Sequence, residues 1–146
     1  MKREILFRGK DIGGKHWFYG SYLKTDDNIN ECFGGKNINI RHQIVQYEAG
    51  DWNLGGWAYY DVIPETIGQF TGLTDKNGVK IFEGDKIRGI SNNPFSMGQC
   101  KEYAVIWGVD HWHIKNTYFT LQELFNYCNN NIEIIGNIHD NKELIK

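Results

Sequence analysis

The sequence predicts a mainly β fold with one short helix near the C-terminus, and three observations support this class. The 146 residues include 17 glycines and only 2 prolines. Aromatic residues make up 14% of the chain and lie in runs separated by Gly, Asn and Asp, a pattern typical of short strands joined by tight turns. Convincing helical spacing of apolar residues occurs in one place, between residues 120 and 128.

Residues 1–62 are predicted to form an N-terminal β subdomain. A glycine-containing turn between two apolar segments predicts a first hairpin. Apolar residues alternate with polar ones through Ile38, Ile40, His42 and Ile44, so one face of that strand is mostly apolar. The elements expected here are a strand at 5–7, a turn at 11–14, a strand at 16–23, a loop at 25–39, a strand at 38–44, a turn at 51–56 and a strand at 57–60.

Residues 63–146 are predicted to form a second β subdomain, whose clearest feature is the segment 67–87. Asn77-Gly78 predicts a type I′ hairpin turn, because both central residues of that turn need a positive φ. Glu83-Gly84-Asp85 predicts a second tight turn. The elements expected after it are a strand at 87–90, a loop at 91–99, strands at 102–107 and 112–119, and a last strand at 132–136.

The predicted helix begins at Thr120. Thr120 and Glu123 have the spacing of a capping box, in which each side chain accepts a hydrogen bond from the other residue's backbone N–H. The apolar residues that follow fall at i, i+3, i+4 and i+7 and form one stripe; they are Leu121, Leu124, Phe125 and Cys128. Three asparagines at 129–131 are expected to end the helix.

Composition excludes several classes of protein. The net charge is −2 and the pI about 6.2, so the surface as a whole is not a polyanion binder. No apolar run approaches the roughly 20 residues of a membrane span, and no signal peptide opens the chain. The cysteines Cys32, Cys100 and Cys128 are odd in number and far apart, a poor disulfide framework, so we expect reduced thiols in a cytoplasmic protein.

Two histidines form the most suggestive local cluster for chemistry. On a strand, His111 and His113 would project from the same face, as two metal ligands must. The spacing does not identify a third ligand, for which His16, His42 and His139 are the candidates. A half-exposed strand without metal is the favoured interpretation, and a metal-dependent hydrolase is kept as an alternative.

Acidic residues in the predicted turns are interpreted as structural. The segment 75–78 resembles the start of a calcium loop, but Lys86 stands at the twelfth position, where such a loop needs Glu. Asp75 is therefore expected to accept hydrogen bonds from turn amides. Glu83 and Asp85 are expected to shape their turn and face water. We predict no catalytic, cofactor-binding or metal-binding residue and no cofactor.

Nucleic-acid binding is a further alternative. Lys80, Lys86, Arg88 and Lys101 precede Trp107, and basic residues beside an exposed aromatic ring can hold single-stranded DNA or RNA. The favoured interpretation is an ordinary charged strand surface with Trp107 in the core, because the chain is acidic overall.

Four segments resemble the YopX family of bacteriophage and prophage proteins; they are Arg3–Arg8, Lys15–Gly20, Ile67–Ile87 and Glu133–Ile138. The third segment, with the turn residues described above, is the most specific. The sequence departs from the family pattern at Gly9-Lys10, where Ala-Trp is frequent, and at His139, where an aromatic residue is common.

The resemblance implies an SH3-like β-barrel in the C-terminal part beside the N-terminal β subdomain. It implies a phage accessory protein in the cytoplasm of the bacterial host. It also implies homo-oligomers, which can form by exchange of segments between copies. It brings no reaction and no catalytic residue. The turn residues of the family motifs are interpreted as structural; they are Gly72, Asp75, Asn77, Gly78, Glu83, Gly84, Asp85 and Gly136.

The leading functional hypothesis is therefore a non-enzymatic, self-associating protein-interaction module with an unidentified phage or host protein as partner. It predicts several aromatic side chains in an interface. The alternatives are a nucleic-acid accessory protein and the metal-dependent hydrolase. No membrane association is expected.

Overall fold

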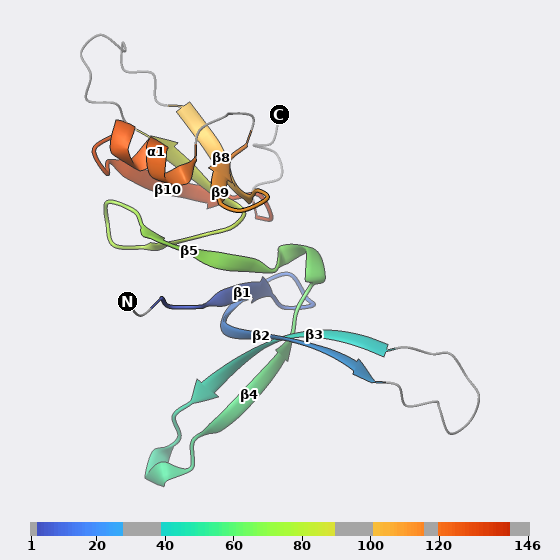
Figure 1. Cartoon of the computed structure of the whole chain (residues 1–146). Coiled ribbons are helices and arrows are strands. Elements are labelled where there is room, and N and C mark those ends of the chain that lie inside the picture. Colours follow the sequence, from blue (N-terminus) through green and yellow to red (C-terminus); the bar gives the residue numbers. More distant parts are fainter. Residues whose placement is uncertain (1–2, 28–38, 90–100, 116–119, 141–146) are drawn as a thin grey trace. The chain divides into compact units, whose positions relative to one another are not determined.

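A computed structural model describes residues 3–27, 39–89, 101–115 and 120–140, and it confirms the mainly β class (Figure 1). The chain forms two compact units. Residues Ile5–Gln69 make up the N-terminal unit, and Met1–Glu4 with Phe70–Lys146 make up the C-terminal unit. The division between Gln69 and Phe70 falls inside a strand, whereas the sequence predicts a boundary between residues 62 and 63.

The elements, in chain order, are β1 (Phe7–Lys10), β2 (Trp17–Asp27), β3 (Asn39–Glu48), η2 (Asp51–Asn53), β4 (Gly56–Asp61), η3 (Pro64–Thr66), β5 (Gly68–Thr74), β6 (Lys80–Phe82), β7 (Asp85–Gly89), β8 (Lys101–Trp107), β9 (Trp112–Ile114), α1 (Leu121–Tyr127) and β10 (Ile132–Asn137). Loop 91–99 and the end of the strand predicted at 112–119 fall largely or wholly outside the described residues.

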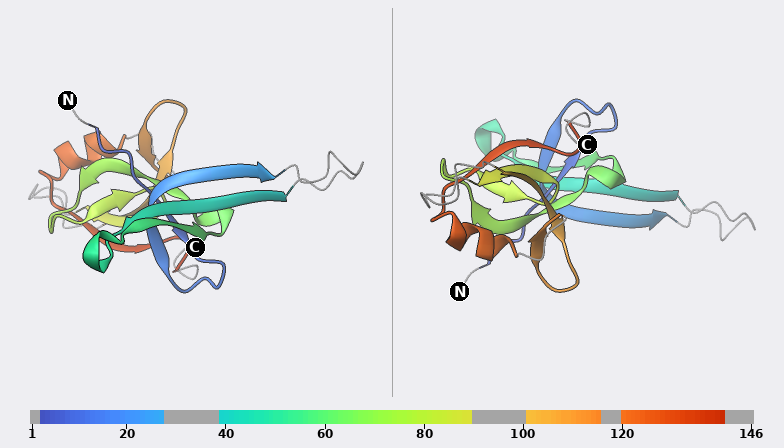
Figure 2. Two further views of the ribbon diagram at one scale, coloured as in Figure 1. Left: turned by 90° about the horizontal axis from the view of Figure 1, so that it is seen from below. Right: turned by 90° about the horizontal axis from the view of Figure 1, so that it is seen from above.

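The N-terminal unit contains an antiparallel sheet in the order β4-β3-β2-β1, and Gly68 and Gln69 of β5 pair with β1. The first hairpin is confirmed, but its first strand is at Phe7–Lys10 rather than 5–7, because pairing with β2 starts at Phe7, opposite Gly20. The loop predicted at 25–39 is wrong at both ends. Strands β2 and β3 continue as a paired ladder to Asp27 and Asn39, because cross-strand pairing outweighs the weak strand preference of Asp and Asn (Figure 2).

The turn at 11–14 is confirmed. Gly14, with a φ of 69°, donates its N–H to the Asp11 carbonyl at 2.8 Å. The Asp11 carboxylate accepts from the backbone N–H of Lys15 at 2.7 Å and of His16 at 3.0 Å. These hydrogen bonds, that from His16 first, lower the pKa of Asp11.

The C-terminal unit contains a second antiparallel sheet, in the order β10-β7-β8-β9, together with the β5–β6 pair and α1. In the described residues this sheet has two ends, β10 and β9, so the expected barrel is not closed. Its core is aliphatic apart from one ring and one thiol; the members are Ile81, Ile87, Val105, Ile114, Leu121, Leu124, Phe125, Cys128 and Ile132.

The predicted helix is confirmed in detail. Both hydrogen bonds of the capping box between Thr120 and Glu123 are present, at 3.1 Å and 2.8 Å. All four residues of the predicted apolar stripe are buried in the core. Asn129 and Asn130 have positive φ values of 51° and 60°, which end the helix as expected.

The turn after β5 differs from the predicted type I′. Only Gly78 has a positive φ, of 80°, while Asn77 does not. Gly78 donates its N–H to the Asp75 carbonyl at 3.0 Å, and Asp75 donates its own to the Val79 carbonyl at 2.8 Å. This is the pattern of a three-residue loop closed by glycine in the left-handed region.

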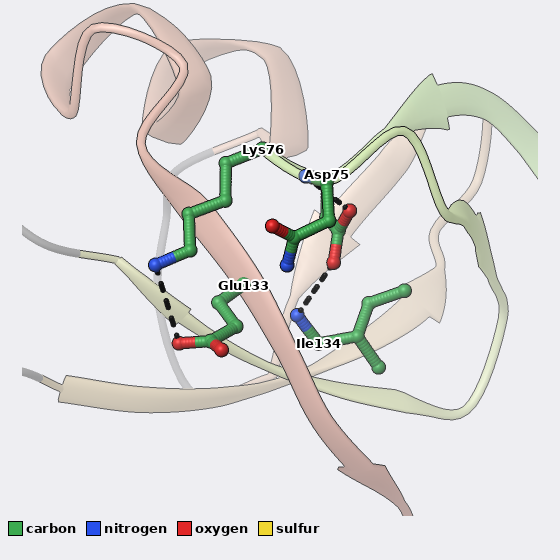
Figure 3. A network of polar contacts seen from close by, with 5 residues as sticks. Asp75, Lys76, Glu133 and Ile134 are labelled. Carbon is green, nitrogen blue, oxygen red and sulfur yellow. Dashed lines mark hydrogen bonds and ion pairs between the residues drawn. The ribbon is translucent and has the colours of Figure 1, made fainter.

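Asp75 links this loop to a distant strand (Figure 3). One carboxylate oxygen accepts from the backbone N–H of Asn77 at 2.8 Å and of Val79 at 3.0 Å, which confirms its predicted role. The other oxygen accepts from the N–H of Ile134 in β10 at 3.3 Å. The Lys76 N–H also donates to the Ile132 carbonyl at 2.8 Å, so the loop and β10 are tied together by backbone and side chain.

The turn between β6 and β7 is also held by hydrogen bonds to residues far along the chain. Gly84 has a φ of 86°, donates its N–H to the Val105 carbonyl at 2.9 Å and accepts from the Ile138 N–H at 2.8 Å. The Asp85 carboxylate accepts from the Phe82 N–H at 2.8 Å. Asp85 shapes the turn as predicted, but it does not face water, since only 2% of it is exposed.

Two further motif glycines lie at irregularities of strand pairing. Gly72, with a φ of 89°, lies within the register shift of the β5–β6 pair. Gly136 lies where the register of the β10–β7 pair shifts. Both positions are bulges or irregularities, at which glycine is common.

We expect Gly78→Val and Gly84→Val each to lower the free energy of unfolding by more than about 1 kcal/mol, because valine is strained at a positive φ. Gly56→Val is the control, since Gly56 has an ordinary φ and nothing lies within 4 Å of the place that a Cβ would take. Urea denaturation of the three variants measures the difference. Equal stability of all three would contradict the turn assignment.

We expect Asp75→Ala to cost about 1–3 kcal/mol, because three backbone N–H groups lose their acceptor. Glu133→Gln is the matched control, because its ion pair with Lys76, at 3.6 Å, is partly exposed and contributes at most about 1 kcal/mol. Chemical denaturation of both variants checks this, and an Asp75→Ala variant as stable as the control would refute the role of the carboxylate.

Candidate interaction surface

The sheet of the N-terminal unit carries aromatic side chains on both faces. Directly opposed residues share a face, so Tyr22, Ile44 and Tyr60 lie together on what we call the inner face. Ile44 is fully buried there, and the rings of Phe18 and Tyr60 stack at 3.9 Å with an interplanar angle of 7°. His42 stacks on Tyr22 and bonds its hydroxyl at 2.7 Å. The inner face is therefore packed around Ile44, while Ile40, nearer the end of β3, is 47% exposed.

The opposite face is not packed in this way. The register places six apolar or aromatic side chains on it, which we call the aromatic face: Tyr19, Leu23, Val45, Tyr47, Trp57 and Tyr59. The exposed fractions are 45% for Tyr19, 59% for Tyr47, 65% for Trp57 and 57% for Tyr59. Tyr47 and Trp57 lie directly across from each other with ring centroids 5.4 Å apart. Exposed apolar clusters of this kind mark interaction surfaces.

Charges of both signs border the aromatic face. Arg41 and Asp61 share the face and form a 4.0 Å ion pair, with each side chain about half exposed. Asp61 also accepts from the Gln43 amide at 3.1 Å. A cation and an anion side by side suit a protein surface better than a phosphate backbone.

At the other end of the face, two cations contact one ring. The Arg8 guanidinium lies 4.6 Å and the Lys10 ammonium 5.8 Å from the Trp17 ring centre. Arg8 is buried, so its guanidinium contacts the Trp17 ring out of reach of solvent.

The predicted pair of histidines is brought together, but not as a strand pair. Strand β9 begins at Trp112, so His111 precedes it, and the rings of His111 and His113 lie 4.7 Å apart. His111 bonds the neighbouring Asp110 carboxylate. Of the candidates for a third ligand, His42 bonds the Tyr22 hydroxyl. His139 lies beside the Gly84 turn, where a Cβ on Gly84 would be 3.1 Å from the His139 ring. Throughout the described ranges, no group of three or more His, Cys, Asp or Glu is placed to hold a metal ion.

Trp107 is not in the core, contrary to expectation. It is 47% exposed and packs edge-on against Trp112, across the β8–β9 pair, at 4.5 Å. The β8–β9 hairpin is short, and its loop ends with the Gly108 N–H donating to the His111 carbonyl at 2.8 Å. Trp107 therefore caps the end of the hairpin instead of filling the interior.

The basic residues predicted beside Trp107 do not form a solvent-facing row. Lys80 pairs with Glu4 at 2.6 Å, and Arg88 pairs with Glu102 at 2.9 Å. Lys86 is buried. The side chain of Lys101 lies outside the described residues. The cations that the structure describes here are engaged with carboxylates or buried, which weakens the case for a phosphate track.

Gly55 and Cys128 each have a structural explanation. Gly55-Gly56 leads into β4, and a Cβ on Gly55 would lie 2.6 Å from the Tyr47 hydroxyl. Cys32 and Cys100 lie outside the described residues. Cys128 is buried, and burial raises the pKa of its thiol.

The aromatic face was missed by sequence reasoning. Trp57 and Tyr59 alternate within one strand, which puts them on the same face. Tyr47 and Tyr19 join them only through the β2–β3–β4 register, which no local pattern specifies. The alternation of large aromatics in residues 57–60 was the one available signal.

Comparison with protein families identifies the chain. The model of the family described as YopX protein matches residues 6–146. The chain belongs to the YopX family. The crystal structure of protein EF1440 from Enterococcus faecalis is similar to this YopX chain, with a TM-score of 0.60 and 23% identity over 99% of this chain and 100% of that one. That likeness shows a shared fold.

The curated proteins contain no match to this YopX chain. Among the described residues, no helix has both the length and the apolar character needed to cross a membrane.

We expect Cys128 to be inert toward alkylation in the folded protein. Burial removes access and raises the pKa of the thiol, so little thiolate forms at neutral pH. The experiment uses a Cys32→Ser, Cys100→Ser background, in which Cys128 is the remaining thiol. Labelling with iodoacetamide, followed by mass spectrometry, is expected to be slow until urea is added; rapid labelling without denaturant would contradict the burial.

Proposed function

We propose that this YopX-family protein is a non-enzymatic protein-interaction module that associates with copies of itself. The observation that supports it is the aromatic face, on which Tyr19, Tyr47, Trp57 and Tyr59 are each about half exposed or more. Large rigid rings give much contact area for little ordering entropy, and they are enriched at the centres of interfaces.

The area of the aromatic face is of the right order for a contact between proteins. Four rings of about 150–250 Å² each, at these exposures, offer about 400 Å². That is about half of the roughly 800 Å² that each partner contributes to a stable interface. Leu23, Val45 and the Arg41–Asp61 pair extend it.

The proposal that the protein is not an enzyme is supported by the causes of the described pKa shifts. The turn amides lower the pKa of Asp11, a hydrogen bond from Tyr60 lowers the pKa of Glu48, and burial raises the pKa of Cys128. Each cause is structural: turn amides, a tyrosine on the neighbouring strand, or burial. From the family, we extend the proposal to a phage or prophage accessory role inside the bacterial host, with a phage or host protein as a further partner.

We expect Tyr47→Ser to weaken self-association by about tenfold or more, because Tyr47 is 59% exposed on the aromatic face and packs against Trp57 there. Tyr127→Ser is the matched control, since Tyr127 is 62% exposed on α1 in the other unit. Sedimentation velocity over a concentration series measures both. A parent protein that stays monomeric, or equal weakening by both substitutions, would contradict the proposal.

The nucleic-acid alternative is tested with the same proteins. Fluorescence anisotropy with labelled single-stranded DNA and RNA at low salt is expected to show no binding that depends on Tyr47. Tight, salt-sensitive binding that Tyr47→Ser abolishes would assign the aromatic face to base stacking instead of protein contact.

A further inference from the structure

Strand β4 is the edge of the N-terminal unit's sheet, and it lacks the features that protect edges. Among the residues that the structure describes, it pairs with β3 on one side and stands last in the strand order. Protected edges carry lysine, proline or inward-pointing charge. The six residues of β4 are Gly-Trp-Ala-Tyr-Tyr-Asp, whose single charge is Asp61 at the end of the strand. Such an edge can accept another strand.

The register shows which backbone groups face outward from β4. Val62, just past β4, donates its N–H to the His42 carbonyl of β3 at 3.0 Å. Antiparallel pairs alternate between bonded and non-bonded, so Tyr60 and Ala58 also bond toward β3. The N–H and C=O groups of the residues between them, Trp57, Tyr59 and Asp61, therefore point away from β3.

The outward edge ends soon after Asp61. The Ile63 N–H, next in the outward series, donates to the Lys10 carbonyl at 2.9 Å, and Asp11 bridges to Val62. The chain therefore covers its own edge beyond β4. What remains is a short outward ladder at Trp57, Tyr59 and Asp61, which suits a strand of equal length.

We propose that β4 pairs antiparallel with β4 of a second copy around a two-fold axis, with Ala58 opposite Ala58 of the second copy. This inference rests on the proposed self-association and adds to it a backbone contact at the edge beside the aromatic face. Trp57 of each copy then exchanges backbone hydrogen bonds with Tyr59 of the other. The close, non-bonded position at the centre is occupied by two small side chains, which it accommodates well.

The chemistry of the edge favours a second copy as the occupant. Pairing about Ala58 places Asp61 across from Gly55 of the second copy, so no like charges oppose each other. It puts the exposed rings of Trp57 and Tyr59 beside those of the second copy on the same face, where cross-strand aromatic pairs are favourable. The two aromatic faces thereby become one continuous surface. A nucleic acid has no backbone amides to complete the ladder.

The test is a matched pair of substitutions at Tyr59. Tyr59→Pro removes the outward N–H and leaves the bonds to β3 in place, and proline is tolerated on edges in this orientation. Tyr59→Ala removes the same ring and keeps the N–H. Sedimentation velocity is expected to show association weakened about tenfold more by Tyr59→Pro than by Tyr59→Ala. Near-ultraviolet circular dichroism of both variants checks the fold.

Hydrogen exchange of the parent protein gives a second readout that needs no variant. The amides of Trp57 and Tyr59 are expected to become protected as the protein concentration rises, while the Val62 amide is protected throughout. Equal association of the two Tyr59 variants, or outward amides that stay unprotected in the assembled protein, would overturn the edge pairing. If Tyr47→Ser still weakens assembly in that case, the proposed function stands with another geometry. A monomeric parent protein would overturn both.

Discussion

Backbone reversal at two glycines is the constraint on which the C-terminal unit depends. Gly78 and Gly84 hold φ near +80° and +86°, where a residue with a Cβ is strained. Each reversal brings a polar group to a strand far along the chain. Asp75 bonds Ile134 beside the first turn, and Gly84 itself bonds Val105 and Ile138 at the second. Because buried backbone groups must be paired, these bonds fix where β8 and β10 lie and so which apolar side chains meet in the core.

The sheet of the N-terminal unit packs side chains against one of its two faces, the inner face. Phe18 and Tyr60 stack and Ile44 is buried on the inner face, so that face is packed around Ile44. Antiparallel sheets that leave a face to water usually alternate apolar with polar residues. On the aromatic face, several positions of β3 and β4 that would carry polar residues carry large aromatic ones instead, at Tyr47, Trp57 and Tyr59. Half-exposed aromatic rings add little to the stability of the unit, which is why they are better explained by contact with another molecule.

Local features were predictable from the sequence and non-local ones were not. The helix was predictable in detail, because its cap and its apolar stripe lie within nine residues, from Thr120 to Cys128. The positions of the turns followed from glycine, but the type of the turn at Gly78 did not, because the Asp75 carboxylate bonds two of its amides and so favours another loop. Closure of a barrel and the burial of Trp107 failed as predictions because both depend on which strands become neighbours. The aromatic face was missed for the same reason.

An unprotected edge is a hazard unless the number of partners it can accept is limited. In the described part of the N-terminal unit, β1 at the other end of the four-strand order is already paired with Gly68 and Gln69 of β5. Beyond β4, Lys10 covers the outward N–H of Ile63. The outward ladder is thus confined to one short strand, and a two-fold pairing of that strand uses it up in both copies. A contact that uses the same surface twice closes on itself, whereas a contact between different surfaces can propagate into filaments. The position of the edge therefore favours a closed pair. A closed pair can tolerate an edge strand without lysine or proline, whereas an open-ended assembly cannot.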